Sequence, residues 1–156
     1  MNRNETPPSL LELTTYLMSR TGKVARGRLA EQLTARGLRL WHMGVLAALV
    51  DFGPHAQREL ADRLSVDRSD IVKIVDDLAG ARLAERARDT ADRRRVTVTV
   101  SPAGRALLDR LHAEVLTVQD DLLAPLTGAE RTQLTDLLRR VYDHVRDDGA
   151  AQRPGR

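Results

Sequence analysis

Residues 57–78 read QRELADRLSVDRSDIVKIVDDL, and this stretch decides the fold. Gln57–Leu64 and the segment that begins at Asp67 both carry apolar residues at the three- and four-residue steps of an amphipathic helix. Residues 65–66 leave room only for a tight turn between them. Asp67 and Asp70 are spaced as an approximate capping box at the start of the second helix. The stretch therefore predicts two short helices joined by a turn.

The flanking sequence predicts one more helix and a hairpin. Residues 40–52 repeat the helical periodicity, and Gly53–Pro54 ends that helix. Residues 96–100 alternate valine with threonine, which is the period of a half-buried strand with the valines inward. We expect residues 83–86 to be the partner strand and the charged residues 87–95 to be the hairpin tip.

Longer helices are predicted at both ends of the chain. Residues 10–36 have broadly helical spacing, with Gly22 and Gly27 as weak points. Residues 102–122 carry a coiled-coil-like seam, and a capping box at residues 127–130 begins the last helix. These stripes exceed what so small a domain needs, so we expect a homodimer, although an intrachain core would use some of the same residues. The expected interface residues are Leu10, Leu11, Leu13, Leu134, Leu138, Val141 and Val145.

This element order predicts a mainly α fold with a small β-hairpin wing, in the winged helix-turn-helix plan. We expect a flexible arm at residues 1–9 and a winged helix-turn-helix DNA-binding domain at residues 40–101. Residues 10–39 and 102–146 form the expected helical dimerisation region, and residues 147–156 an expected disordered tail.

Composition narrows the class of protein. The chain of 156 residues has no cysteine, which excludes disulfides, thiol nucleophiles and thiol-based redox sensing. We see no secretory signal and no apolar window near the roughly 18 residues of a membrane span, so we expect a cytoplasmic protein. The four histidines lack metal-site spacing, and no P-loop, dinucleotide fingerprint or nucleophile elbow is present. We therefore expect no enzyme, no cofactor and no metal.

Charge is concentrated in arginine. The net charge is only +3, but Lys23 and Lys73 are the only lysines among the 25 basic residues. Residues 82–95 hold six arginines against three acids. The planar arginine fork suits phosphates and guanine edges, so this hairpin predicts a contact with nucleic acid. The alternatives are a coding bias toward arginine and an ordinary solvated turn.

Several segments in register carry a more specific likeness: LAALV at 46–50 with Gly53–Pro54, QRELADRL at 57–64, VDRSDIVKIVDDL at 66–78, DRR at 92–94 and VTVTVSPAGRALL at 96–108. With these segments the chain resembles the MarR (multiple antibiotic resistance regulator) family of bacterial transcription factors. Two departures are small. Residues 79–82 read AGAR where the family more often has Glu-Ala-Arg-Gly, which moves the glycine upstream, and Val100 replaces the usual leucine.

The resemblance implies a homodimeric, sequence-specific transcriptional regulator, most often a repressor, that binds a pseudo-palindromic site in double-stranded DNA. The second helix of the reader would lie in the major groove, and its face opposite the apolar stripe supplies the predicted base contacts. These are Arg68, Ser69, Val72 and Lys73, unless that face is simply a solvated helix surface. Gln57 and Arg58, at the start of the first reader helix, are the predicted phosphate contacts, with ordinary solvation as the alternative.

The predicted wing contacts are Asp92, Arg93, Arg94 and Arg95. By resemblance, Arg94 enters the minor groove, and Asp92 holds its guanidinium from the same side of the strand. Arg93 and Arg95 would then point the other way, toward phosphates or toward the body of the domain.

Family members often respond to small aromatic or phenolic effectors, so an effector site is a further expectation. Tyr16, Arg20, Trp41 and His42 offer apolar and cationic groups for it, although packing explains the aromatic residues equally well. The main alternative function is a winged-helix protein-docking module without DNA binding. It rests on five acids at and near the reader: Asp62, Asp67, Asp70, Asp76 and Asp77.

Overall fold

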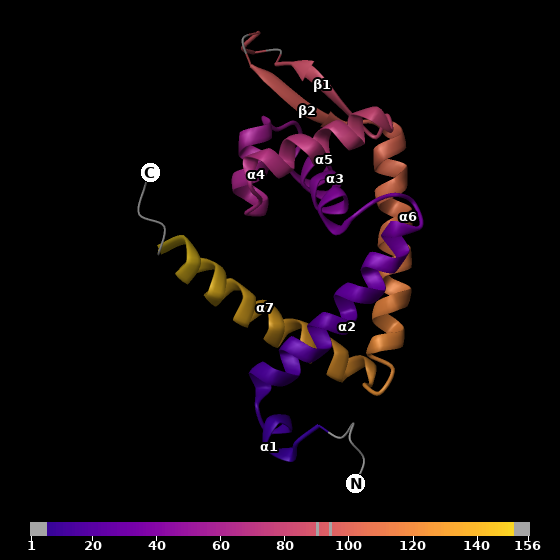
Figure 1. The fold of residues 1–156 in the computed structure, drawn as a ribbon, viewed down its shortest axis with the longest axis vertical. Coiled ribbons are helices and arrows are strands. Elements are labelled where there is room, and N and C mark those ends of the chain that lie inside the picture. The colour runs from indigo at the N-terminus through magenta and orange to yellow at the C-terminus, as the bar shows by residue number, and fades with distance from the viewer. Residues whose placement is uncertain (1–5, 90, 94, 152–156) are drawn as a thin grey trace. The chain divides into compact units, whose positions relative to one another are not determined.

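The computed structural model describes residues 6–89, 91–93 and 95–151, with side chains as far as residue 147. Within these residues the fold is mainly helical with a two-stranded antiparallel hairpin, as the sequence predicts (Figure 1). The chain divides into two compact units, residues 1–118 and 119–156, with α6 crossing the boundary. The elements in order are α1 (Pro8–Leu11), α2 (Thr14–Thr34), α3 (Leu40–Phe52), α4 (Gln57–Leu64), α5 (Arg68–Gly80), β1 (Ala84–Arg88), β2 (Val96–Val100), α6 (Pro102–Leu122) and α7 (Gly128–Ala151).

The N-terminal helix differs from the prediction at both of its expected weak points. α2 continues through Gly22 and Gly27, because a helical glycine costs only about 1 kcal/mol relative to alanine. The break lies earlier, where Leu13 adopts extended backbone angles and separates α1 from α2. α1 already begins at Pro8, inside the segment that was expected to be an arm. Proline is favourable there because its fixed φ suits the first turn of a helix.

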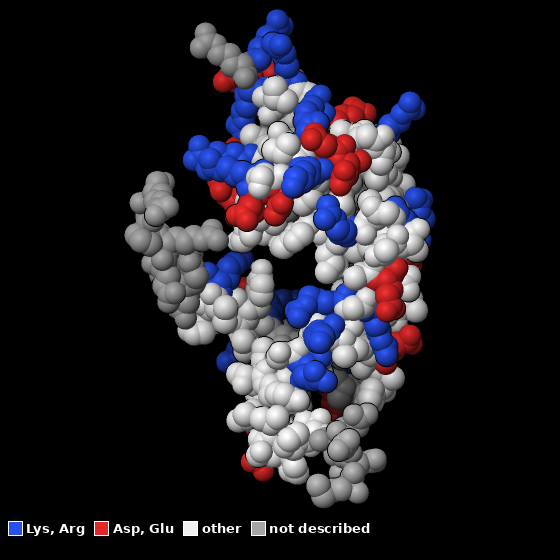
Figure 2. All heavy atoms as spheres, viewed as in Figure 1, with Lys and Arg blue, Asp and Glu red and all other residues white. Residues whose placement is uncertain are grey.

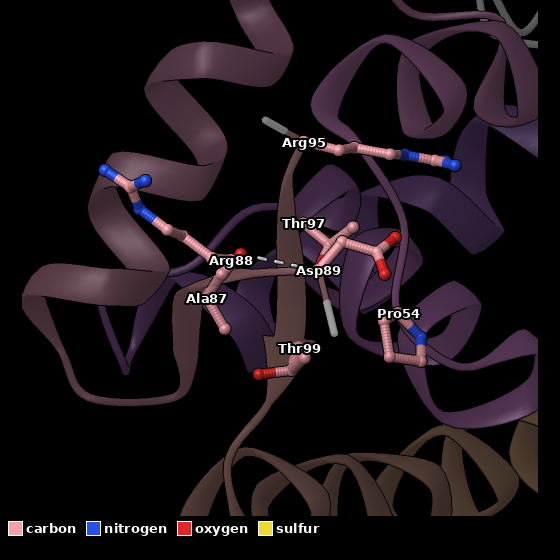
Figure 3. Close-up of a pocket in the computed structure, with 7 residues that line it drawn as sticks. All are labelled: Pro54, Ala87, Arg88, Asp89, Arg95, Thr97 and Thr99. Atoms are coloured by element: carbon pink, nitrogen blue, oxygen red, sulfur yellow. Dashed lines mark hydrogen bonds between the residues drawn. The ribbon is translucent and has the colours of Figure 1, made fainter. Parts of the chain in front are cut away.

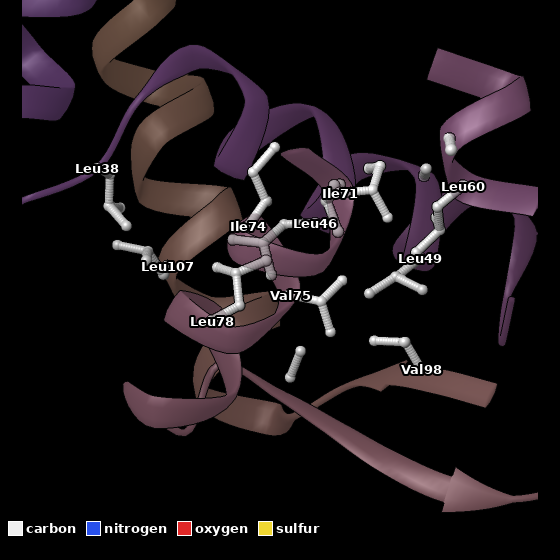
Figure 4. Close-up of a cluster of buried hydrophobic side chains, with 14 of the residues drawn as sticks. Leu38, Leu46, Leu49, Leu60, Ile71, Ile74, Val75, Leu78, Val98 and Leu107 are labelled. Atoms are coloured by element: carbon white, nitrogen blue, oxygen red, sulfur yellow. The ribbon is translucent and has the colours of Figure 1, made fainter. Parts of the chain in front are cut away.

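The core lies among α3, α4, α5 and the hairpin (Figure 4). α3 and α4 have the predicted bounds. The predicted stripe of α5 is fully confirmed, since Ile71, Ile74, Val75 and Leu78 are each no more than 3% exposed. Leucines from outside the reader complete this core: Leu33 and Leu38 near the end of α2, and Leu107 and Leu111 on α6.

The turn between α4 and α5 is made by Ser65, which caps α4 in the left-handed conformation at φ 53°. Asp67 occupies the N-cap position of α5, but the predicted capping box is wrong. The Asp67 side chain makes no cap hydrogen bond, and the Asp70 N–H donates to the Asp67 main-chain oxygen at 3.0 Å.

The hairpin starts one residue later than predicted and pairs residues 84–88 with 100–96 in antiparallel register. His55 adds a single bridge to the other edge of β2, where its N–H and carbonyl pair with Val98. The predicted alternation is only partly right. Val98 is buried, but Val96 is 52% exposed and Thr97 only 5%. Val96 lies near the tip of the hairpin, which projects beyond the helices and leaves no core for it to join (Figure 1).

The Ser-Pro-Ala-Gly junction ties the hairpin to α6. The buried Ser101 hydroxyl donates to the Arg82 carbonyl at 2.7 Å and accepts the Gly104 N–H at 3.0 Å. Arg82 has φ 59°, a left-handed angle that favours glycine. The upstream shift of the glycine noted in the sequence therefore leaves a bulky residue in a glycine conformation.

In the second unit, Arg131 of α7 holds the turn after α6. Its Nε donates to the carbonyls of Leu123 and Leu126 at 3.0 and 3.1 Å, and Nη1 bonds Asp120 at 3.0 Å. The predicted capping box of α7 is confirmed, because Thr127 and Glu130 exchange hydrogen bonds. α7 continues to Ala151, so the prediction of a disordered tail from residue 147 is wrong for residues 147–151. Gly149 does not end α7, just as Gly22 and Gly27 do not end α2.

Candidate nucleic-acid interface

One face of α5 is exposed along its N-terminal half. Arg68, Ser69, Val72 and Lys73 are all exposed, opposite the buried stripe of the same helix. Val72 is 43% exposed, which is unusual for a valine in a helix whose other large apolar side chains are buried. The packing of α5 therefore leaves two cations, a hydroxyl and a methyl-bearing side chain available on a single face.

The start of α4 is less open than the sequence suggests. Arg58 is exposed and lies 4.0 Å from Asp62 one turn later. Gln57 is only partly exposed, and its side-chain nitrogen is buried with no hydrogen-bond partner among the described residues. Arg58 is thus the more accessible of the two predicted phosphate contacts.

Glu59 joins α4 to the hairpin. One carboxylate oxygen accepts the Ala56 N–H at 2.9 Å, and the other is ion-paired with the Arg95 guanidinium. The Ala56 hydrogen bond is the largest cause and lowers the pKa of Glu59; burial opposes it by raising this pKa, and the Arg95 side chain lowers it further, so that the net shift is downward. Of the two directions predicted for Arg95, the structure has the one toward the body of the domain.

The remaining wing residues are exposed where they are described. Arg93 and Asp92 are both exposed, while Arg94, the predicted minor-groove residue, lies outside the described residues. Arg86 is paired with Asp76 of α5 at 2.5 Å. No ion pair joins Arg82, Arg88 or Arg93 to another described residue, so these cations stay available. Figure 2 shows Lys and Arg around the hairpin and over the reader helices, interleaved with Asp and Glu.

A pocket lies on the wing itself (Figure 3). In this view Asp89 and Arg95 point to one side of the hairpin and Arg88 to the other. The lining residues are Pro54, Ala87, Arg88, Asp89, Arg95, Thr97 and Thr99. It is distinct from the effector site that the sequence predicts.

The predicted effector residues His42 and Trp41 differ in how accessible their side chains are in the structure. His42 is 1% exposed and fully engaged: Nδ1 accepts the Arg39 N–H at 2.9 Å, and Nε2 lies 3.0 Å from an Asp77 oxygen. Because Nδ1 accepts, the proton is on Nε2, which donates to Asp77. His42 is thus a structural link between α3 and α5, and both of its ring nitrogens are already bonded within the chain. Trp41 is 49% exposed, and no hydrogen bond or ion pair among the described residues joins it to Tyr16 or Arg20.

Most of the predicted dimer residues have exposed side chains in the single chain. In the first unit Leu11 and Leu13 are about half exposed, at 49% and 50%. In the second unit Leu138, Val141 and Val145 are 43–63% exposed. Leu10 and Leu134 are partly buried. These side chains leave apolar surface open on helices of both units.

Sequence reasoning missed the residues that shape the wing. Glu59 is not among the predicted site residues, although its position three residues after Ala56 is that of a capping glutamate. Asp89 is not among them either, yet its carboxylate accepts backbone hydrogen bonds from the tip. The pairing of Arg95 with Glu59 had no local signal, because the two residues are 36 positions apart.

The described residues hold no group of three or more side chains placed to bind a metal. Among the helices that the structure describes, none has both the length and the apolar character needed to cross a bilayer.

Comparison with known proteins identifies the family. The MarR family model matches residues 29–95. The HTH-type transcriptional repressor NicR of Pseudomonas putida is 34% identical over 67% of this chain, and the match spans 66% of NicR, just under two thirds of its length. The HTH-type transcriptional regulator PecS of Dickeya dadantii is 28% identical over 92% of this chain and 89% of its own length.

Solved structures agree with this likeness. BpsR of Bordetella bronchiseptica, solved to explain regulation of its DNA binding by 6-hydroxynicotinic acid, has 26% sequence identity and a TM-score of 0.71. The superposition covers 85% of this chain and 94% of BpsR. The residues that the family model matches include α3, α4, α5 and β1, where the geometry above places the reader and the first strand of the wing. The chain belongs to the MarR family of winged helix-turn-helix transcriptional regulators.

Proposed function

We propose that this protein is a homodimeric transcriptional regulator that represses by binding a pseudo-palindromic site in double-stranded DNA. The observation that carries the proposal is the exposed face of α5, on which Arg68, Ser69, Val72 and Lys73 stand opposite a fully buried stripe. Residues in the first turns of such a helix reach base edges when the helix enters the major groove. Arg68 suits a bidentate contact with guanine, Val72 a thymine methyl and Lys73 a phosphate.

The wing supplies the second contact. Arg82, Arg88 and Arg93 are exposed without a described ion-pair partner, and the predicted role of Arg94 in the minor groove remains part of the proposal. A single reader and wing make few contacts, so two copies at a spacing of about 34–36 Å are needed for tight, specific binding. The exposed apolar side chains of α7, centred on Leu138, Val141 and Val145, support such a dimer.

The protein-docking alternative is weakened by how the acids are used. Asp76 is paired with Arg86, Asp77 with His42 and Arg39, and Asp62 lies near Arg58. Acids that neutralise neighbouring side chains leave less charge for a basic partner protein. Of the five acids, this leaves Asp67 and Asp70 at the start of α5, for which the described residues supply no ion pair.

We extend the proposal to an aromatic acid as effector, by analogy with BpsR and 6-hydroxynicotinic acid. Trp41 offers an exposed aromatic surface, and Tyr16 and Arg20 supply the phenol and cation that a carboxylate-bearing ring would need. His42 is left out, because both of its ring nitrogens are already bonded. Titration of a protein–DNA complex with a panel of aromatic acids tests this extension: release of DNA supports it, and no release by any member contradicts it.

A footprint on the DNA upstream of the gene tests the main proposal. We expect protection of two half-sites one helical turn apart, with affinity falling on the order of 10³-fold between 50 and 200 mM salt if six phosphates are contacted. A protein-docking module would give no footprint at any salt concentration.

A further inference from the structure

Asp89 links both sides of the wing tip. Its Oδ1 accepts the N–H of Ala91 at 2.8 Å and, more weakly, that of Asp92 at 3.5 Å. Its own N–H donates to the Arg95 carbonyl at 2.8 Å, and the Arg95 N–H donates to the Asp92 carbonyl at 2.9 Å. The end of β1, the tip and the start of β2 are thus joined through one residue.

The charge of Asp89 is unfavourable for the proposed function. The segment 82–95 carries six arginines, and this carboxylate lies among them, partly exposed on the wing. Figure 3 shows it on the same side of the hairpin as Arg95. A negative charge here repels DNA phosphates and so opposes binding. If Asp89 assists binding, it does so through hydrogen-bond geometry.

We propose that Asp89 is a positioning residue for DNA binding, whose carboxylate oxygen fixes the turn that presents the arginines of the wing tip. This inference rests on the proposed function. Aspartate and asparagine both accept backbone N–H bonds two residues ahead and tolerate turn geometry, so the role requires the oxygen acceptor and not the charge. Arg93, exposed in this turn, is the described side chain whose direction depends on it.

A positioning role and a purely electrostatic role predict opposite effects of Asp89→Ala on DNA binding, which makes the inference testable. If Asp89 acts only as a charge, Asp89→Ala and Asp89→Asn remove the same repulsion and tighten DNA binding alike. If it positions the tip, Asp89→Ala weakens binding and Asp89→Asn does not. Asparagine therefore serves as the conservative variant that restores the hydrogen bond while keeping the charge removed.

Fluorescence anisotropy of the full chain on the footprinted upstream DNA, at a fixed salt concentration, is the first measurement. We expect Asp89→Ala to weaken binding by about five- to tenfold, the effect of one lost hydrogen bond, and Asp89→Asn to bind as well as the unaltered chain or somewhat tighter. Glu85→Ala is the matched control, because Glu85 is an exposed acid of the same hairpin whose carboxylate bonds no other described residue. It should not weaken binding. Equal or tighter binding by Asp89→Ala overturns the inference.

Amide hydrogen exchange, measured by NMR without DNA, is the second measurement. The Ala91 amide should exchange faster in Asp89→Ala and stay protected in Asp89→Asn, with the melting temperature of both close to that of the unaltered chain. Unchanged Ala91 exchange in Asp89→Ala overturns the positioning role even where DNA binding is intact. An unaltered chain that binds no DNA at low salt, with Ala91 protected as expected, instead identifies failure of the proposed function.

Discussion

A Cβ atom on Gly104 would lie 2.0 Å from the carbonyl oxygen of Leu83. The same oxygen accepts the Ser101 N–H at 3.0 Å, so the first turn of α6 and the residue before β1 are in direct backbone contact. This close approach sets the direction in which the hairpin leaves the helical core. It explains why the Ser-Pro-Ala-Gly junction must contain glycine at its last position.

Gly104→Ala is therefore expected to destabilise the fold strongly, by roughly 3 kcal/mol or more, since the obstructing atoms belong to backbone and cannot rotate away. Urea unfolding followed by circular dichroism measures the change. Gly27→Ala is the control, because a Cβ there meets nothing within 4 Å and alanine in the middle of α2 should stabilise by about 1 kcal/mol. A Gly104→Ala protein as stable as the unaltered chain would contradict the contact.

At Arg82, a substitution is expected to stabilise the fold. Its φ of 59° is strained for any residue with a Cβ, so Arg82→Gly should stabilise the protein by roughly 0.5–1 kcal/mol, after allowance for the extra freedom of glycine in the unfolded chain. Arg82→Ala removes the same charge and keeps the strain, and it should give no gain. Urea midpoints of the two variants separate backbone strain from charge, and equal midpoints would rule out strain as the cause.

The His42–Asp77 bond predicts a specific loss of stability. Asp77→Ala leaves the buried Nε2–H of His42 without its acceptor, which costs about 1–3 kcal/mol. Asp77→Asn keeps an acceptor oxygen and should recover most of the loss. Asp76→Ala, which breaks only the solvent-exposed pair with Arg86, should cost no more than about 1 kcal/mol. Guanidinium unfolding of the three variants gives the comparison, and similar losses for Asp77→Ala and Asp76→Ala would count against the buried bond.

Glu59 predicts how stability depends on pH. Its folded pKa is lowered, first by the Ala56 N–H and then by Arg95, so the folded state favours the ionised carboxylate. This contribution is fully present above the unfolded pKa of about 4.3 and is lost as the pH falls through the lower folded pKa. The unaltered chain should therefore lose more unfolding free energy than Glu59→Gln between pH 6 and pH 3. Parallel pH profiles of the two proteins would show that Glu59 makes no such contribution.

For DNA recognition, Arg68→Ala should relax base preference at one position in each half-site, because Arg68 is proposed to contact a base edge. Selection from random DNA measures that preference. If selection returns the same motif for Arg68→Ala, this residue binds phosphate.

Arg94→Ala, by contrast, should weaken affinity for DNA sharply while leaving the dimer and its melting temperature unchanged. Unchanged affinity of Arg94→Ala would remove the wing tip from recognition.

Hydrophobic periodicity and the residues that begin or end helices predicted the helices and strands well wherever the signal was local. The bounds of α3 and α4, the buried stripe of α5 and the capping box of α7 all follow from residues within one or two turns of each other. Such patterns can be recognised in the sequence because a helix brings residues three and four apart onto one face, whatever lies around it. The family was recognised from sequence segments that resemble those of its members, and the wing from the alternation of residues 96–100 and the arginines of residues 82–95.

Tertiary structure alone decided which side chains are free to act. His42 and Trp41 are adjacent in sequence, yet one is locked against Asp77 and the other is half exposed. Arg95 meets Glu59 across 36 residues, and Val96 is exposed while its neighbour Thr97 is buried. Burial and pairing depend on what packs against a residue from distant parts of the chain, and no local pattern encodes that neighbour.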